Sequence, residues 1–572
     1  MHRKRSAHFV IALLLILGGG FLAHRIQTDG GRIAVRDVRF AGTAGTIMSG
    51  LLYIPENATS EQPAPGVLAV HGYINSRETQ DGFAIEFARR GFVVLALDQA
   101  GHGFSDPPAF ANGYGGPDGL RYLKSLEFVD PENIGLEGHS MGGWAVLIAA
   151  ATYPDDYRSI AIVGSSTGTA GAAEGSSDTP RNLGVIFSRW DEFSGFMWDA
   201  PVPANIVSTE KLKTVFGTAD PVVPNRLYGS IEDGSARILH MPAVTHPGDH
   251  LSTEAIGRTV AWMQSTLSGG NDLSTDNQIW YWKEFGTLLA LIGAVWFLFP
   301  MSQLLLGTEA FGELVGPEPE PRSAQGLLWW TAALLTASVP VATYYWANHL
   351  GNALFPVTAM WPQSITTGIM TWAFGNGLLT ALLIIIWHYS SNKKRAARPY
   401  HYGLGGNITH IFRSLGLALC LVGSVYLLLA ISDWAFKTDF RIWVLAIKLM
   451  TPRHFGAFVT YFPPFAVFFA VLSVALHGQL RTGVTANILL LVAGFVLLLL
   501  YQYLPLLSGG TMPLGEPLLT IVAFQIIPLL SIAAVISTVL FRNTGSIYPG
   551  ALVNAVLITW IVVAGQAFQY GN

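Results

Sequence analysis

Long apolar blocks in the second half of this sequence constrain its fold more than any other feature. From about residue 279 onward, each block is long enough to cross the roughly 30 Å hydrocarbon core of a bilayer, which takes about twenty helical residues. The whole chain is 51% hydrophobic and only 12% charged, whereas about a quarter of the residues of a soluble domain are charged. Residues 279–572 are therefore predicted to form an all-α polytopic transmembrane domain.

Eight spans are expected in this domain. They are 285–306, 326–346, 367–389, 412–434, 456–477, 486–507, 517–541 and 549–568. A further apolar stretch, Phe9–Ala23, follows the basic N-terminal residues. Because no clean small-residue cleavage site comes after it, residues 1–31 are predicted to form an uncleaved signal-anchor helix.

The basic residues between spans predict the topology. The basic start, Met1–Arg5, stays in the cytoplasm and the segment after the first span is exported. The same alternation puts Ser391–Pro399, Arg481 and Arg542 in the cytoplasm. We therefore expect a multi-pass plasma-membrane protein whose soluble part is extracytoplasmic.

One connection departs from this rule. Residues 435–455 are placed outside, although they contain four basic side chains, Lys437, Arg441, Lys448 and Arg453. The same connection contains "RIWVLAIKLM", which is predicted to be a short amphipathic helix along the membrane interface.

A soluble α/β region, residues 32–267, follows the first span, and a polar linker, 268–278, comes after it. Strands are expected at Ile33–Phe40, Thr46–Ile54, Gly66–His71, Phe92–Asp98, Ile134–Gly138, Ile160–Gly164, Leu183–Ser188 and Ala236–Met241. Helices are expected at Glu78–Arg90, Asp118–Leu126, Gly142–Tyr153 and Leu251–Leu267. Two leading strands followed by alternating strands and helices predict a mostly parallel eight-stranded sheet with helices on both faces.

A G-x-S-x-G pentapeptide, Gly138 to Gly142, lies between the fifth expected strand and a helix. This is the context of a nucleophile elbow, a tight turn that holds its serine in a strained backbone conformation. Neighbouring Cβ atoms would collide in such a turn, and glycines at 138, 142 and 143 remove them. Ser140 is therefore the expected nucleophile.

Three stretches resemble the α/β-hydrolase superfamily, namely "VLAVHGY" (67–73), "FARRGFVVLALDQAGHGFSD" (87–106) and "IGLEGHSMGG" (134–143). The resemblance covers about residues 33–267 and is closest to the serine-aminopeptidase, monoglyceride-lipase and dienelactone-hydrolase-like branches. It implies that the backbone N–H groups of Tyr73 and Met141 form an oxyanion hole. It also implies that His102, within a "DxxGHGxS" stretch, has a structural role.

A serine nucleophile needs a base, and the expected chain order for this fold is serine, acid, histidine. His246 lies in the loop directly after the last strand and is the favoured base. His250 lies nearer the last helix and is the alternative. His240 falls inside a strand, so a structural role is expected.

Two aspartates compete for the role of the acid. Asp191 follows the expected seventh strand and is favoured, because without that strand the segment before it would have no place in the sheet. Asp220 in "FGTADPVVP" matches a family pattern, but it follows a predicted helix, "STEKLKTVFG", with Ser208 as N-cap and Gly217 as C-cap. Glu192 is expected to be a solvated neighbour.

The segment after Asp191 contains Phe193, Phe196, Met197 and Trp198. These side chains are expected to line an acyl pocket, to contact the membrane, or to pack on their own sheet. No large cap domain is evident in the sequence, so an accessible site is expected.

These observations predict a membrane-embedded serine hydrolase that cleaves an ester, thioester or amide of a small or lipid-like substrate through an acyl-enzyme. The alternatives are a transporter or scaffold with a hydrolase-like sensing module, and an acyltransferase. We expect no metal and no other cofactor, and the single Cys420 excludes an intrachain disulfide and Cys-based zinc motifs. The net charge of −4 argues against nucleic acid. Substrate and membrane lipids are the expected partners, and the oligomeric state is left open.

Overall fold

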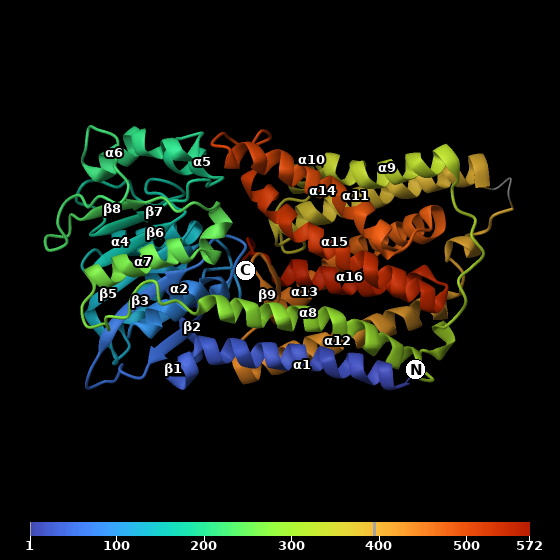
Figure 1. Cartoon of the computed structure of the whole chain (residues 1–572), viewed down its shortest axis with the longest axis horizontal. Helices are drawn as coiled ribbons and strands as arrows, with labels where there is room; N and C mark the ends of the chain where they lie inside the picture. The colour runs from blue at the N-terminus through green and yellow to red at the C-terminus, as the bar shows by residue number, and fades with distance from the viewer. Residues whose placement is uncertain (1, 393–395, 572) are drawn as a thin grey trace.

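A computed structural model of the chain describes residues 2–392 and 396–571. Two parts lie end to end (Figure 1): an α/β region, residues 32–267, and a helical region made of α1 and everything after residue 279. The basic residues at 393–395, which carry part of the topology prediction, lie outside the described residues.

The α/β region is built on one sheet. Its strands are β1 (Ile33–Ala41), β2 (Ile47–Pro55), β3 (Ala64–Val70), β4 (Val93–Asp98), β5 (Val129–His139), β6 (Ser159–Val163), β7 (Leu183–Ile186) and β8 (Arg237–His240). They lie in the order β1-β2-β4-β3-β5-β6-β7-β8, with β2 antiparallel to both neighbours and all later pairs parallel. The predicted eight-stranded, mostly parallel sheet is confirmed.

Helices cover both faces of this sheet and bury apolar side chains against it. α3 (Gly116–Lys124) and α4 (Met141–Thr152) pack into the apolar core on one face, and α2 (Asp81–Arg89) and α7 (Thr253–Thr266) pack on the other. Two short helices, α5 (Ser194–Trp198) and α6 (Glu210–Phe216), lie between β7 and β8.

The ends of α6 test the capping prediction. Gly217 is the C-cap, in the left-handed conformation expected of it, but the N-cap is Thr209 and not Ser208. The Thr209 hydroxyl accepts a hydrogen bond from the Leu212 N–H at 3.3 Å, because the helix begins one residue later than predicted.

The helical region consists of long apolar helices. They are α1 (His2–Gln27), α8 (Trp280–Leu306), α9 (Gly326–Ala342), α10 (Tyr344–Leu354), α11 (Ser364–Trp387), α12 (Ile408–Phe436), α13 (Pro452–Val474), α14 (Val484–Leu507), α15 (Pro517–Thr544) and α16 (Ile547–Ala564). Within the described residues, eight helices are long and apolar enough to cross a membrane, and the pair α9–α10, bent by 55°, would make a ninth. The sequence predicts nine spans, and the helices reach this number only if the bent pair is a single span.

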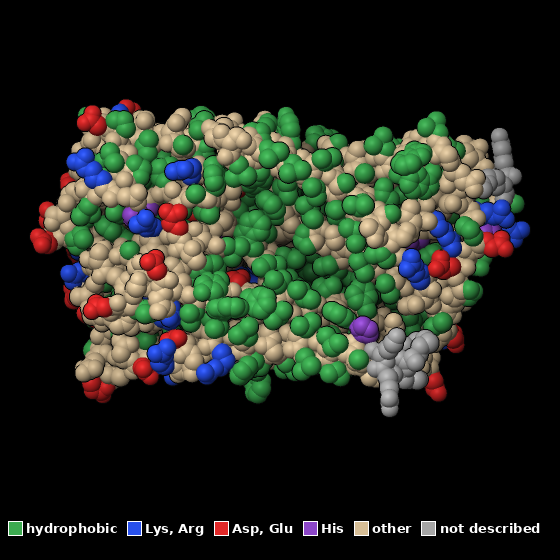
Figure 2. All heavy atoms as spheres, in the orientation of Figure 1, with side chains coloured by type: hydrophobic (Ala, Val, Ile, Leu, Met, Phe, Trp, Pro, Cys, Tyr) green, Lys and Arg blue, Asp and Glu red, His purple; other side chains and the backbone are tan. Residues whose placement is uncertain are grey.

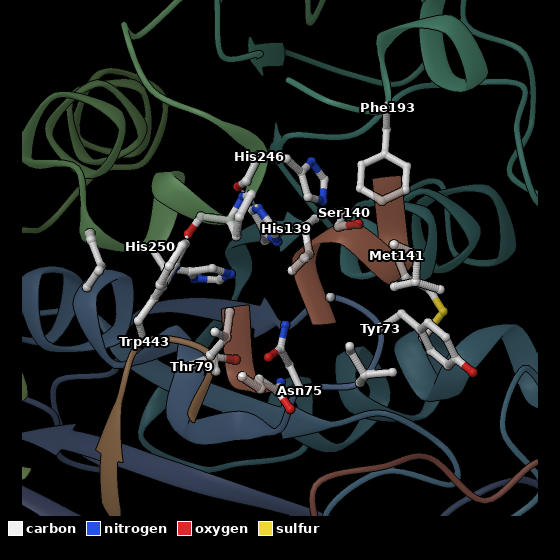
Figure 3. Close-up of a pocket in the computed structure, with 18 of the residues that line it drawn as sticks. Tyr73, Asn75, Thr79, His139, Ser140, Met141, Phe193, His246, His250 and Trp443 are labelled. Carbon is white, nitrogen blue, oxygen red and sulfur yellow. Dashed lines mark hydrogen bonds between the residues drawn. The ribbon is translucent and has the colours of Figure 1, made fainter. Parts of the chain in front are cut away.

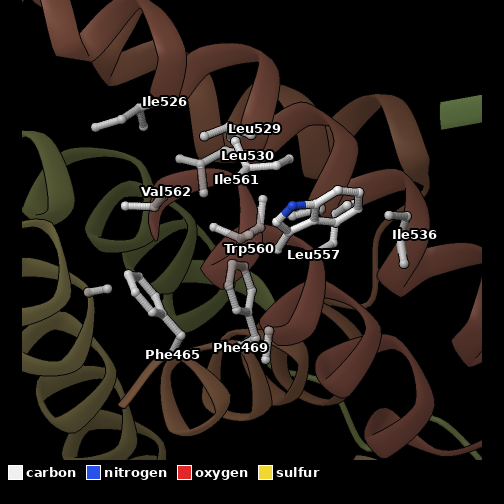
Figure 4. Close-up of a cluster of buried hydrophobic side chains, with 14 of the residues drawn as sticks. Phe465, Phe469, Ile526, Leu529, Leu530, Ile536, Leu557, Trp560, Ile561 and Val562 are labelled. Atoms are coloured by element: carbon white, nitrogen blue, oxygen red, sulfur yellow. The ribbon is translucent and has the colours of Figure 1, made fainter. Parts of the chain in front are cut away.

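The core of the helical region extends over most of its helices, and α13, α15 and α16 contribute one part of it. Figure 4 shows Phe465 and Phe469 of α13 beside Trp560 of α16 and the aliphatic side chains of α15. The Trp560 indole N–H donates to the Lys448 carbonyl at 2.8 Å, so this core also holds the connection between α12 and α13.

α1 packs along α8, although the whole α/β region separates them in sequence (Figure 1). A Cβ atom on Gly286 would lie 2.7 Å from the Gly19 carbonyl oxygen, and one on Gly293 would lie 2.9 Å from the Ala12 carbonyl oxygen. Small residues let two apolar helices approach this closely, as in membrane helix pairs. The first helix is therefore part of the helical region.

The connection between α12 and α13 is a β-hairpin, β9 (Phe440–Ile442) paired with β10 (Leu445–Ile447). The predicted amphipathic helix is wrong. Each basic side chain of the connection contacts the α/β region: Lys437 with Asp37 (3.0 Å), Arg441 with Glu78 (3.2 Å), Lys448 with the Ser76 hydroxyl (3.0 Å) and Arg453 with Asp106 (2.6 Å). These contacts give the four basic side chains acidic or hydroxyl partners on the α/β region.

Candidate active site

Ser140 lies at the turn between β5 and α4, with φ 54° and ψ −121°. Non-glycine residues rarely adopt this conformation, which costs about 1–3 kcal/mol where it occurs. A Cβ atom on Gly142 would overlap the Val70 carbonyl, and one on Gly138 would overlap the Gly142 backbone. The Ser140 N–H donates to the Val163 carbonyl at 2.8 Å, which fixes the turn against β6. The strained turn predicted from the glycines is present.

Ser140 and His246 line one cavity of about 270 Å³. Figure 3 shows both side chains near its centre, with Phe193, Met141 and Tyr73 to one side of them. The structure gives no hydrogen bond between the Ser140 hydroxyl and the His246 ring. Catalytic hydrogen bonds are often long in the absence of substrate and tighten when it binds.

His246 and Asp191 are in direct contact. His246 begins a 3-10 turn, His246–Leu251, that follows β8, and Asp191 follows β7. The His246 Nδ1 atom lies 2.8 Å from Asp191 Oδ2, while Asp191 Oδ1 accepts the Phe193 N–H at 2.8 Å. The two parallel strands end side by side, so the fold itself brings these side chains together.

Burial shifts the pKa of both members of this pair toward the neutral form. It raises the pKa of Asp191 to about 7 and lowers the pKa of His246 to about 4. Charge on either group is disfavoured because the Asp191 side chain is fully buried and the His246 ring nearly so. Asp191 therefore keeps its proton to a higher pH than an isolated aspartate does, and His246 loses its proton at a lower pH than an isolated histidine does.

The alternative residues do not form the contact that joins His246 to Asp191. Asp220 is exposed, in the segment between α6 and β8, and does not line the cavity. His250 does line the cavity, but its ring packs 4.1 Å from the His139 ring, and neither of its nitrogens has a hydrogen-bond partner among the described residues. The His240 Nδ1 atom lies 2.6 Å from Asn225 Oδ1, which suits the expected structural role.

Glu192 is not the solvated neighbour that the sequence suggested. Its Oε2 atom accepts the backbone N–H of His246 at 2.7 Å, and its Oε1 atom accepts the Tyr503 hydroxyl at 2.6 Å. Burial and the adjacent Asp191 raise the pKa of Glu192 to about 8. The carboxyl group thus joins the histidine loop to helix α14, which carries Tyr503.

The residues expected to form an oxyanion hole also line the cavity. Neither the Tyr73 N–H nor the Met141 N–H donates a hydrogen bond within the part of the chain described. Met141 is the first residue of α4, where helical amides lack an internal acceptor. The Tyr73 hydroxyl accepts a bond from Gln569 Nε2 at 2.6 Å and lies 3.4 Å from the Ser364 hydroxyl.

The helical region closes one side of the cavity. Its contribution consists of Glu284, Arg441, Trp443, Val444, Leu518, Ile521 and Gln525. No cap domain is inserted in the α/β region, but hairpin β9–β10 and helix α15 take the place of one on this side, while Phe110, Phe196 and Leu251 leave the cavity partly exposed.

The side chains of the aromatic segment after Asp191 point to two different places. Phe193, Phe196 and Met197 line the cavity, as one of the three expectations had it. Trp198 is fully buried in the sheet core instead, where its indole N–H donates to the Ser165 carbonyl at 3.0 Å.

Sequence reasoning missed three residues that hold the site from the helical region. The Trp443 indole N–H donates to the Pro247 carbonyl at 2.7 Å, directly after His246. Tyr503 binds Glu192, and Gln569 binds Tyr73. These partners are 196, 311 and 496 residues apart, so no local pattern could have indicated them. Across the described residues, no group of three or more His, Cys, Asp or Glu side chains could hold a metal ion.

Comparisons with known proteins agree with this fold. Residues 65–239 match the family model of the alpha/beta hydrolase fold. A serine hydrolase-like protein of Dictyostelium discoideum is 33% identical over 89 residues, 15% of this chain and 25% of that protein. Dipeptidyl peptidase 8 of Homo sapiens is 30% identical over 142 residues, 22% of this chain and 16% of the peptidase. The 2-(acetamidomethylene)succinate hydrolase of Mesorhizobium japonicum is 32% identical over 108 residues, 19% of this chain and 38% of that enzyme.

Solved structures are similar at lower identity. The esterase of Pyrobaculum calidifontis is 16% identical with a TM-score of 0.30, covering 46% of this chain and 92% of the esterase. Dienelactone hydrolase of Anabaena variabilis is 16% identical with a TM-score of 0.28, covering 41% of this chain and all of that enzyme. The chain spans well under half the length of the curated relatives it matches. It contains an α/β-hydrolase domain.

Proposed function

We propose that this protein is a serine hydrolase embedded in a membrane, which cleaves a carboxylic ester through an acyl-enzyme. One observation supports it above all: the Asp191–His246 pair, 2.8 Å apart, lines the same cavity as Ser140 on its strained turn. A binding-only module has no need for a serine held in that conformation. The relatives named a hydrolase and a peptidase, and the neighbour named an esterase, are in accord with this reaction class.

In the proposed mechanism, His246 takes the proton of the Ser140 hydroxyl as its oxygen attacks the substrate carbonyl. The Asp191 carboxylate holds the His246 ring in the tautomer whose Nε2 atom can accept that proton. The Tyr73 and Met141 N–H groups donate to the oxyanion, and loss of one such donor typically costs about 100- to 1000-fold in rate. The His246 imidazolium then protonates the leaving group, and water releases the acid in a second, equivalent step.

The membrane location and its sidedness are part of the proposal. The apolar helices are of spanning length, and helix α1 runs from the far end of the helical region to the α/β region (Figure 1). With a basic N-terminus in the cytoplasm, this direction puts the α/β region on the extracytoplasmic side.

A fluorophosphonate probe tests the nucleophile, because it forms a covalent adduct only with an activated serine. The wild-type protein and a control with the exposed Ser125 changed to alanine are expected to be labelled, and Ser140→Ala is not. Absence of labelling in all three would favour the transporter or scaffold with a sensing module. Product analysis with an added alcohol acceptor separates hydrolysis from acyl transfer.

A further inference from the structure

The cavity at Ser140 has walls of two origins, and this bears on the substrate. The α/β region contributes Phe110, Phe193, Phe196 and Leu251, and the helical region contributes Leu518 and Ile521 from the first turns of α15. Most of the lining is therefore hydrocarbon or aromatic.

Some of this apolar lining is exposed at the boundary between the regions. Phe110 is 49% exposed, Phe196 59% and Leu251 38%. Figure 2 shows hydrophobic side chains gathered around a hollow between the α/β region and the helices. Large exposed apolar side chains beside a site indicate a surface that meets another apolar phase.

The neighbouring helix α8 shows at what depth the cavity lies. Glu284 lines the cavity, and the side chains beside it on α8, Tyr281, Trp282 and Phe285, are 43%, 48% and 44% exposed. Exposed tyrosine and tryptophan at the end of a spanning helix are typical of the membrane–water interface. The cavity therefore lies where the ester group of a membrane lipid would be.

The charges in the cavity wall select among lipids. Among the described lining residues, the permanent cation is Arg441, and it is bound to Asp439 and Glu78. Burial lowers the pKa of His139 and His250, so these rings are neutral near pH 7. A phosphate group would find no free positive charge here. An uncharged alcohol could instead reach the neutral polar side chains of Asn75, Thr79 and Gln525.

We infer that the substrate is an uncharged membrane lipid ester that enters the cavity from the bilayer, with its hydrocarbon acyl chain between α15 and the aromatic segment after Asp191. This inference rests on the proposed function, and it names the substrate class of that site. Ser140 attacks the acyl carbon, and the alcohol leaves with the proton from His246. Water then attacks the acyl-enzyme, and the acid is released to the membrane.

The first test uses the full-length protein in lipid nanodiscs with p-nitrophenyl acetate and p-nitrophenyl palmitate. We expect a higher kcat/KM for the palmitate. Ile521→Trp fills the proposed chain site and is expected to lower kcat/KM for palmitate by about tenfold or more, with little effect on acetate. Leu497→Trp, at a 65% exposed position on α14, is the matched control and should change neither.

The second test compares dioleoylglycerol with dioleoylphosphatidylglycerol in the same nanodiscs. Release of oleate from the first alone supports the inference, and equal release from both overturns the uncharged head group. A wild-type preference for acetate, or equal losses on both p-nitrophenyl esters in Ile521→Trp, overturns the acyl site. Leu518→Trp replaces Ile521→Trp if that variant does not fold.

Labelling by the fluorophosphonate distinguishes failure of the proposed serine hydrolase activity from failure of the inferred lipid substrate. If Ser140 is labelled and acetate is the better substrate, the protein is a serine hydrolase and the lipid inference fails. If Ser140 is not labelled and no ester is cleaved, both fail.

Discussion

The two walls of the Ser140 cavity differ in how they are made. The wall from the α/β region consists of loops at the ends of adjacent parallel strands, where one sheet brings Ser140, Asp191 and His246 together. The wall from the helical region consists of a hairpin and a helix end, and it touches those loops through single side chains such as Trp443 and Tyr503. The first wall contains the proposed catalytic groups. The second holds the loops in place and shapes the entrance.

This difference gives a reason for so many helices where one anchor would suffice. Three loops of the site, those of Tyr73, Glu192 and Pro247, each accept a hydrogen bond from the helical region. The helical region is therefore a structural part of the site. The predictions below change one wall at a time.

The largest effect is expected at the acid of the α/β wall. Asp191→Asn should lower kcat by about 10⁴, because the amide favours the wrong histidine tautomer. Asp220→Asn changes an exposed side chain outside the cavity and should keep most of the activity. Steady-state kinetics on one soluble ester measures both. Equal, modest losses would contradict the assignment.

The next effect concerns the ion pairs between the two regions. Arg441 is buried against Asp439 and Glu78. Arg441→Met leaves the buried Asp439 carboxylate without its ion-pair partner, although Glu78 keeps Arg77, and should cost about 3–5 kcal/mol of stability. Arg453 pairs with Asp106 at an exposed position, and Arg453→Met should cost about 0–1 kcal/mol. Thermal unfolding in detergent compares them. Similar shifts for both would mean that the hairpin is not fastened by its buried charge.

The pH dependence of kcat/KM reports the protonation of the buried pair. In the proposed mechanism, the active form has an ionised Asp191 and a neutral His246. Since burial raises the pKa of Asp191 to about 7, activity should fall about tenfold per pH unit below that value. A rate that stays constant down to pH 5 would show that the pair is solvated in the working enzyme.

The smallest effect is expected in the helical wall. Tyr503→Phe removes the hydroxyl bound to Glu192, a hydrogen bond worth about 0.5–1.5 kcal/mol, or roughly a twofold to tenfold loss of kcat. KM should change little, because Tyr503 does not line the cavity. Tyr501→Phe, at a 56% exposed position on the same helix, is the control and should have no effect. A rise in KM with kcat unchanged would show that Tyr503 acts on substrate binding and not on the histidine loop.

Sequence reasoning predicted the features that local patterns determine. The strands alternate with helices at regular spacing, and three glycines indicate the turn at Ser140. Both the sheet and the turn could therefore be predicted from the sequence. The preference for Asp191 over Asp220 came from counting strands, and the segment before Asp191 does form the seventh strand of the sheet. Its catalytic role stays a prediction.

The features that were missed depend on distant partners. The segment around Arg441 has an apolar and basic pattern that suits an interfacial helix, but its charges pair with the α/β region, and this pairing stabilises a hairpin. Glu192 looked solvated because its partner, Tyr503, lies 311 residues later. The cover over the site was not predicted for the same reason, because Ile521 and Trp443, which line the cavity, belong to the helical region.

The bond from Gln569 to Tyr73 sets an order of events during synthesis. Gln569 is translated 496 residues after Tyr73 and follows α16, the last of the apolar helices. The loop that would cradle the oxyanion therefore meets its final neighbour only when every helix before it has been made. A chain that stops before Gln569 would contain the whole α/β region, but its Tyr73 loop would lack this hydrogen bond.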